Sequence, residues 1–134
     1  AGVQGVLQRS YRGLQSRAAG LLGDGCLTVI KGGGGEFERN PSKDIAVFGL
    51  RDAVDLDEVA PAMVAAPRKL SEPEQPVDIA GLWGGQVEDA FAQATVTGTA
   101  ALALWTVGRA ASLSEGQEMA ERLWRDRLGG KVAA

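Results

Sequence analysis

The 134-residue chain contains no histidine and a single cysteine, Cys26. These absences exclude imidazole-based zinc sites, serine triads, imidazole bases and an internal disulfide framework. No apolar run approaches the roughly 18 residues that suggest a membrane span, and the start of the sequence lacks the pattern of a secretory signal. We therefore expect a soluble, cytoplasmic protein without a membrane partner.

Aromatic residues make up only 5% of the chain, whereas glycine occurs 19 times, about twice its average usage. The hydrophobic fraction of 45% is sufficient for one buried core. The net charge of −3 excludes a uniformly basic nucleic-acid-binding domain. However, residues 1–43 carry six basic side chains against three acidic ones, a local charge of +3. We expect any anionic partner to meet this first third of the chain.

The first third predicts a helix followed by two strands. Apolar residues recur at three- and four-residue steps from Arg9 to Leu22, which is typical of one stripe of a helix. The runs 26–30 and 45–50 are rich in apolar and β-branched residues without polar alternation. Such runs are typical of parallel strands covered on both faces. Cys26 is therefore expected to be a small buried residue rather than a reactive thiol.

The rest of the chain changes from irregular to helical. Residues 52–77 contain four of the five prolines and an acidic cluster, so they should run mostly over the surface. Three helices follow. The first is capped by Asp78, the second lies within 87–110, and the third begins at Ser112 with a capping box and ends at Gly129.

Together these elements predict an α/β fold, the C-terminal portion of a mainly parallel sheet domain that is flanked by helices and ends in a helical pair. Two strands make only a marginal sheet on their own. Because both are expected to be covered on both faces, they require neighbouring strands that the sequence does not obviously supply. We therefore expect residues 1–134 to be a partial domain of a larger protein.

The most informative segment, 31–41, follows the first predicted strand. Open α/β sheets bind ligands at the carboxyl ends of their parallel strands. The four glycines from Gly32 to Gly35 let backbone N–H groups approach an anion, while Lys31 and Arg39 add positive charge. The segment matches neither a Walker loop nor a dinucleotide fingerprint. The alternative is a flexible turn whose glycines only relieve strain, and composition does not decide between the two.

Other charged residues near this loop have two interpretations each. Glu36 and Glu38 are spaced so that both can hold a magnesium ion, although solvated loop charges are the commoner case. Arg9, Arg12 and Arg17 lie on the first predicted helix, where they can meet phosphates or form a solvated helix face.

The order of these segments resembles the C-terminal part of the anthranilate phosphoribosyltransferase-like proteins, glycosyltransferase family 3 of the nucleoside phosphorylase and phosphoribosyltransferase superfamily. The similarity extends from about Tyr11 to Leu128. Within it, the sequence from Leu27 to Pro41 resembles the YbiB-type DNA-binding branch. The segments 49–52, 94–108 and 112–116 fit the same family.

The resemblance implies a two-domain protein. Its members have an N-terminal helical domain, through which they commonly form homodimers, and a large α/β domain built on a mainly parallel sheet. The family's diphosphate-binding glycine loop lies in the first half of its chain and has no counterpart here. The resemblance thus implies that residues 1–134 are the C-terminal segment of the α/β domain.

The chain departs from the family's enzymes at their magnesium site. Anthranilate phosphoribosyltransferases follow this strand with His-Gly and then Asp-Gly-x-Asp-Glu, whose last two acids hold magnesium. Here Lys31 stands at the histidine, Gly34 at the first aspartate, Phe37 at the second and Glu38 at the glutamate. Only one metal ligand of the pair remains, while the added lysine makes the cleft more favourable to an anionic polymer.

We therefore predict a phosphoribosyltransferase-like protein that binds DNA or RNA without sequence preference and without a cofactor. No catalytic residue is assigned. The candidate contacts are Lys31, Gly32, Gly33, Gly34, Gly35 and Arg39, followed by Arg9, Arg12, Lys43 and Arg51. The alternative is an active phosphoribosyltransferase that uses phosphoribosyl diphosphate and magnesium, held by Glu38 and Glu36. A third interpretation is a scaffold segment that serves packing and dimer stability.

Overall fold

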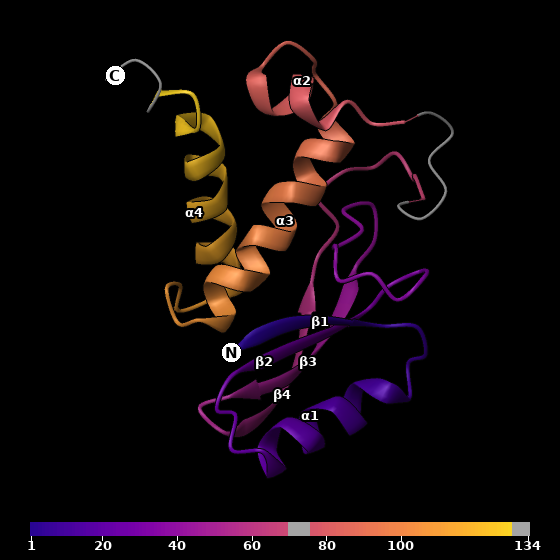
Figure 1. Ribbon diagram of the computed structural model, residues 1–134, viewed down its shortest axis with the longest axis vertical. Coiled ribbons are helices and arrows are strands. Elements are labelled where there is room, and N and C mark those ends of the chain that lie inside the picture. The colour runs from indigo at the N-terminus through magenta and orange to yellow at the C-terminus, as the bar shows by residue number, and fades with distance from the viewer. Residues whose placement is uncertain (70–75, 130–134) are drawn as a thin grey trace.

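The computed structural model describes residues 1–69 and 76–129. Within them, one sheet lies between a single helix and a helical pair (Figure 1). The elements are β1 (Gly2–Val6), α1 (Tyr11–Leu21), β2 (Leu27–Lys31), β3 (Ile45–Arg51), β4 (Val54–Ala60), α2 (Ile79–Gly84), α3 (Ala90–Thr106) and α4 (Leu113–Asp126). The chain is therefore α/β, and it ends in the predicted helical pair, α3 and α4.

The sheet is mixed, with the strand order β1-β2-β3-β4. β1 and β2 are parallel, whereas β3 runs antiparallel to both β2 and β4. The sequence predicts β3 as part of a parallel sheet, and for its pairings within the described residues this prediction is wrong. Burial on both faces, the property that the sequence does indicate, comes from helices on both sides of the sheet and does not require parallel neighbours.

β1 and β4 are the neighbouring strands that the two predicted strands require. β1 pairs with β2 along its whole length, from Gly2 opposite Leu27 to Val6 opposite Lys31. β4 pairs with all seven residues of β3 and forms a hairpin with it. The prediction that residues 52–77 run mostly over the surface is confirmed for β4, five of whose seven residues are exposed, but the sequence does not predict that these residues form a strand.

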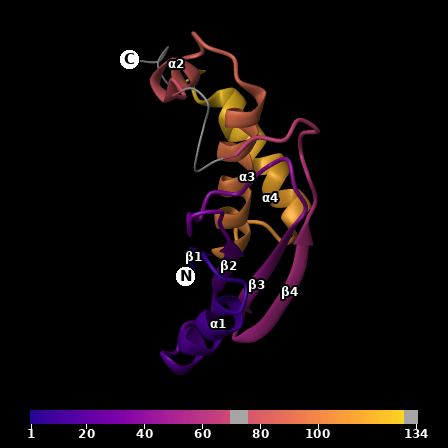
Figure 2. The same cartoon turned by 90° about the vertical axis from the view of Figure 1, so that its right-hand side faces the viewer.

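Two apolar clusters hold helices against opposite faces of the sheet (Figure 2). On one face, Ala19 of α1 packs with buried residues of β1, β2 and β3. On the other face, Leu102 and Trp105 of α3 pack with Ile30 and Val47. Only the C-terminal half of α3 covers the sheet, so the α3–α4 pair extends away from it toward α2.

α1 contacts the sheet through small residues rather than through its large apolar ones. Ser16 and Ala19 are buried, while Leu14 and Leu21 are 56% and 89% exposed. A Cβ atom added at Gly20 would lie 3.6 Å from Leu50. The predicted helix is confirmed, but its apolar stripe lies in solvent because the small residues permit a closer approach to the sheet.

The helix caps predicted at Asp78 and Ser112 are confirmed, and the structure adds a third cap at Asp89. The side chains of Asp78, Asp89 and Ser112 accept hydrogen bonds from N–H groups in the first turns of α2, α3 and α4. α2 ends at Gly85, whose left-handed φ of 78° closes the helix. α3 and α4 cross where Gly116 meets the backbone of α3. In the described ranges, no helix combines the length and apolar character needed to cross a membrane.

Candidate anion-binding site at the carboxyl ends of β1 and β2

The parallel β1–α1–β2 unit brings two loops together at one end of the sheet. Val6 and Lys31, the last residues of β1 and β2, are register partners, and the Gly32 N–H donates to the Val6 carbonyl at 3.1 Å. The loop after β1 leads into α1, and the loop after β2 is the glycine-rich segment. A Cβ atom added at Gly35 would lie 3.8 Å from Leu7. The two loops therefore lie side by side where open α/β sheets bind ligands.

Three cationic side chains surround this end of the sheet. Arg9 is exposed three residues beyond β1, and Arg12 lies in the first turn of α1 with its guanidinium 4.1 Å from the centre of the Phe48 ring. Lys31 is exposed at the end of β2. Its side chain lies on the same face of the sheet as α1, because side chains alternate along a strand and Val29, two residues earlier, packs on that face.

The arginines are close enough to influence one another. The Nε–H of Arg12 donates to the Arg9 carbonyl at 3.2 Å. Burial lowers the pKa of Arg12, the positive charge of Arg9 lowers it further, and the charge of Asp57 opposes both. In the described part of the chain, neither arginine forms an ion pair with a carboxylate, and neither does Lys31. Positive charge is therefore available to an anion at this edge.

The N-terminus of α1 belongs to the same edge. Ser10 occupies the cap position, but its side chain makes no capping hydrogen bond, and the first turn contains no acidic residue. The helix thus starts without a negative charge beside its N–H groups. The positive end of the helix dipole adds to the field of the three cations.

The N–H groups of the glycine loop already face an anion, the carboxylate of Glu36. The Gly33 N–H donates to Oε1 at 2.7 Å and the Gly34 N–H donates to Oε2 at 2.6 Å. Burial by itself would raise the pKa of Glu36, but hydrogen bonds from the backbone N–H groups and the charge of Lys31 outweigh it and lower this pKa. The loop therefore has an anion-binding conformation, and its own side chain fills it.

Close packing fixes the backbone of this loop. A Cβ atom at Gly5 or at Gly32 would overlap the backbone of Glu36. Both positions therefore require glycine, in β1 and at the start of the loop, so that the loop can fold back onto the ends of the strands. The sequence predicts that Gly32 turns its N–H toward an anion, whereas this N–H donates to the Val6 carbonyl. The sequence gives no signal for Gly5, which precedes the motif by almost thirty residues.

The two acidic residues that the sequence offers as magnesium ligands have different environments. Glu36 is turned toward the loop amides, and Glu38 is exposed. Among the residues that the structure describes, no three acidic or cysteine side chains gather into a group that could hold a metal ion. A magnesium ion at Glu36 would have to compete with the two N–H groups for the carboxylate.

Arg39 lies inside the protein, with only 4% of its surface exposed. Its Nη2 donates to the Pro61 carbonyl, its backbone N–H donates to Thr99 Oγ1 at 3.0 Å, and its Nε has no hydrogen-bond partner. Burial lowers the pKa of Arg39, and Asp44 partly offsets this effect. The guanidinium joins the loop to the segment after β4, so it is not presented to a polymer in this conformation.

The guanidinium of Arg51 also binds carbonyl groups of the chain itself. Nη1 donates to the Trp105 carbonyl at 2.8 Å and Nη2 donates to the Ala110 carbonyl at 3.0 Å. The same group lies 5.1 Å from the centre of the Trp105 ring. These carbonyls lie at and just beyond the C-terminal end of α3, so Arg51 ties that end of the helix to β3.

Lys43 is exposed at the other end of the loop and lines a cavity of about 810 Å³. Arg68 and Lys69 line the same cavity, together with Asp78, Glu88 and Asp89. Its charged lining is therefore balanced. The sequence interpretation missed this cavity because residues 67–69 lie in the proline-rich segment that it treated as surface loop.

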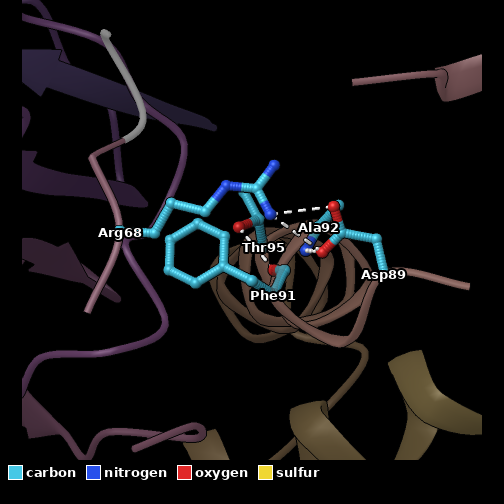
Figure 3. A network of polar contacts seen from close by, with 5 residues as sticks. All are labelled: Arg68, Asp89, Phe91, Ala92 and Thr95. Carbon is cyan, nitrogen blue, oxygen red and sulfur yellow. Dashed lines mark hydrogen bonds and ion pairs between the residues drawn. The ribbon is translucent and has the colours of Figure 1, made fainter. Parts of the chain in front are cut away.

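Arg68 is held in place on the wall of this cavity (Figure 3). Its Nη1 lies 2.8 Å from Asp89 Oδ2, and its guanidinium lies 5.1 Å from the centre of the Phe91 ring. The backbone carbonyl of Arg68 accepts a hydrogen bond from Asn40 at 2.9 Å. Asn40 thus connects the glycine-rich segment to the cavity wall, while Asp89 also caps α3.

No protein-family model matches the chain, and a search of curated proteins finds no significant match.

Proposed function

We propose that the chain binds nucleic acid through the basic edge at the carboxyl ends of β1 and β2, without sequence preference. One observation carries the proposal. The β1–α1–β2 unit gathers Arg9, Arg12 and Lys31 around one end of the sheet, and in the described part of the chain none of the three forms an ion pair with a carboxylate, although Asp57 and Glu36 lie close enough to act on Arg12 and Lys31. A nucleic-acid backbone is the polymer whose regular negative charge such an edge suits.

We also propose that the chain belongs to the protein family that its sequence resembles. In this view the chain is the C-terminal segment of the α/β domain of an anthranilate phosphoribosyltransferase-like protein. The complete domain has a mainly parallel sheet, to which β1 and β2 belong, and the complete protein is a homodimer. The fold supports this view to the extent that a parallel crossover unit precedes the glycine loop.

Among the candidate residues, the proposal places the binding contacts on the exposed cations. Arg9, Arg12 and Lys31 contact phosphates at the edge, and Lys43 extends the contact along the loop. Arg39 and Arg51 support the fold, because their guanidinium groups donate to carbonyl groups of segments distant in sequence, whereas Arg12 and Lys31 donate only to carbonyl groups within three residues of themselves. No base-reading group is proposed, so binding is set by charge and depends steeply on salt.

The test is fluorescence anisotropy of a labelled single-stranded oligonucleotide, titrated with the chain at several salt concentrations. The double variant Arg9→Ala/Lys31→Ala removes two proposed phosphate contacts. The slope of log Kd against log salt should then fall by about 1.4, since each single-strand phosphate contact contributes about 0.7. Binding should weaken equally for oligonucleotides of different sequence.

The matched control is Arg109→Ala/Arg122→Ala, which removes the same charge from exposed positions after α3 and on α4. The control should leave the slope unchanged. Equal slopes for both double variants would refute the proposed edge. If the oligonucleotide does not bind at low salt, while the complete parent protein binds phosphoribosyl diphosphate only with magnesium, the transferase alternative replaces this proposal.

A further inference from the structure

The contact between Glu36 and the glycine loop has the geometry of a bound phosphate. Two adjacent N–H groups, those of Gly33 and Gly34, each donate to a different oxygen of one anionic group at 2.7 and 2.6 Å. A phosphate presents the same pair of oxygens, and consecutive N–H groups of this kind form anion-binding concavities in many proteins. The bound group in this chain is a carboxylate from the loop itself.

We propose that the Gly33 and Gly34 N–H groups form a phosphate site that the Glu36 carboxylate keeps closed. The inference rests on the proposed function, because it makes this loop one of the phosphate contacts. A ligand phosphate and Glu36 compete for the same two N–H groups. The apparent affinity of the loop for phosphate is therefore the intrinsic affinity reduced by the fraction of time that the site is open.

The packing of the loop allows the Glu36 side chain to leave the two N–H groups without a movement of the backbone. The backbone of Glu36 lies against Gly5 and Gly32, where no Cβ atom would fit. The Glu36 side chain itself contacts the exposed part of the loop and is only partly buried. Rotation of the side chain about its own bonds can therefore open the site while the backbone keeps its anion-binding conformation.

The charges around the loop favour exchange of one anion for another. Lys31 ends the strand that leads into the loop, and its charge contributes to the lowered pKa of Glu36. When the carboxylate leaves, this positive charge is available to the incoming phosphate. Glu38, two residues further on, is exposed, and no hydrogen bond joins it to the two N–H groups.

The experiment compares Glu36→Ala with Glu38→Ala in the 134-residue chain, because both variants remove one negative charge from the same loop. The probe is inorganic pyrophosphate without magnesium, titrated by calorimetry and by amide chemical shifts. Glu36→Ala should bind pyrophosphate about tenfold more tightly than Glu38→Ala, because only Glu36→Ala removes the carboxylate that competes with pyrophosphate for the Gly33 and Gly34 N–H groups. The Gly33 and Gly34 amide signals should shift on binding.

Equal affinities of the two variants, or unmoved Gly33 and Gly34 signals, would overturn the inference. Glu36→Gln is the second variant, because it keeps the size of the side chain and supports the loop if removal of the carboxylate disorders it. Its affinity should lie between those of the wild type and Glu36→Ala. A labelled oligonucleotide distinguishes failure of this inference from failure of the proposed function. If the oligonucleotide binds the wild type while Glu36→Ala and Glu38→Ala have equal affinities for pyrophosphate, only this inference fails. If the oligonucleotide binds neither the wild type nor any variant, the proposed function fails as well.

Discussion

Arg51 offers a sharp test of whether a candidate phosphate contact is structural. Two charge-assisted hydrogen bonds, at 2.8 and 3.0 Å, join its guanidinium to the Trp105 and Ala110 carbonyls. Such bonds contribute about 1.5 kcal/mol each at the lower end of their range, and the contact with the Trp105 ring adds about 0.5 kcal/mol. Arg51→Ala should therefore lower the free energy of unfolding by about 3.5 kcal/mol.

The assay is urea unfolding followed by the fluorescence of the three tryptophans. Domains of this kind are stable by about 5–15 kcal/mol, so the variant should remain folded in water with a lower midpoint and an unchanged slope. Arg51→Lys should recover about half of the loss, because one ammonium group lacks the two-pronged geometry. Arg109→Ala, at an exposed position, is the control and should change the free energy by less than about 0.5 kcal/mol.

Two results would refute this reasoning. One is a loss for Arg51→Ala that is no larger than the loss for Arg109→Ala. The other is a normal stability of Arg51→Ala combined with a reduced salt dependence of oligonucleotide binding. The second result would return Arg51 to the set of phosphate contacts.

Four further substitutions test backbone and cap positions elsewhere in the fold. Ala53 has a φ of 62° in the β3–β4 turn, so Ala53→Gly should raise the melting temperature by a few degrees, equivalent to about 1 kcal/mol. Asp89 caps α3, and its pKa is lowered first by a backbone N–H of the first turn. Asp89→Ala should therefore lower the free energy of unfolding by about 1–2 kcal/mol near neutral pH. In urea titrations, the difference in this free energy between the wild type and Asp89→Ala should shrink as the pH falls below about 3.9, where the wild-type carboxylate begins to be protonated. Gly116→Ala should cost about 1–3 kcal/mol because its Cβ would lie 2.8 Å from a carbonyl oxygen of α3, whereas Gly13→Ala, with free space on α1, should stabilise by about 0.5–1 kcal/mol in the same assay.

The helices were predictable because their signals are local. The caps at Asp78 and Ser112 depend on residues within one turn of each other, and both have the predicted role. The face of α1 was not predictable by the same means. Large apolar residues mark a stripe, but contact with the sheet is made by Ser16 and Ala19, whose small size becomes important only when a sheet is present.

The two edge strands of the sheet, β1 and β4, were not predicted from the sequence, for two different reasons. β1 contains two glycines in five residues, and its strand conformation depends on pairing with β2, more than twenty residues away. β4 carries an alternation that was available in the sequence, with Leu56 and Ala60 packed inward and acidic residues between them. The prolines that follow β4 and its high charge favoured the prediction of a surface loop instead.

The position of the candidate site was predictable, but its internal contacts and part of its composition were not. The order of strand and glycines places the glycine loop at the carboxyl end of β2. Sequence alone does not reveal that Glu36 fills this loop, since a carboxylate three residues away can equally point into solvent. Likewise, the burial of Arg39 depends on the segment after β4, which is distant in sequence.

The two edges of the sheet differ in their resistance to self-association. β4 presents Asp55, Asp57 and Glu58 along one edge, and such charges discourage a second molecule from adding a strand there. β1 forms the opposite edge without a single charged side chain. Intermolecular strand addition, and any aggregation that begins from the folded state, should therefore start at β1, and a lysine placed there would be the economical way to improve the solubility of the chain.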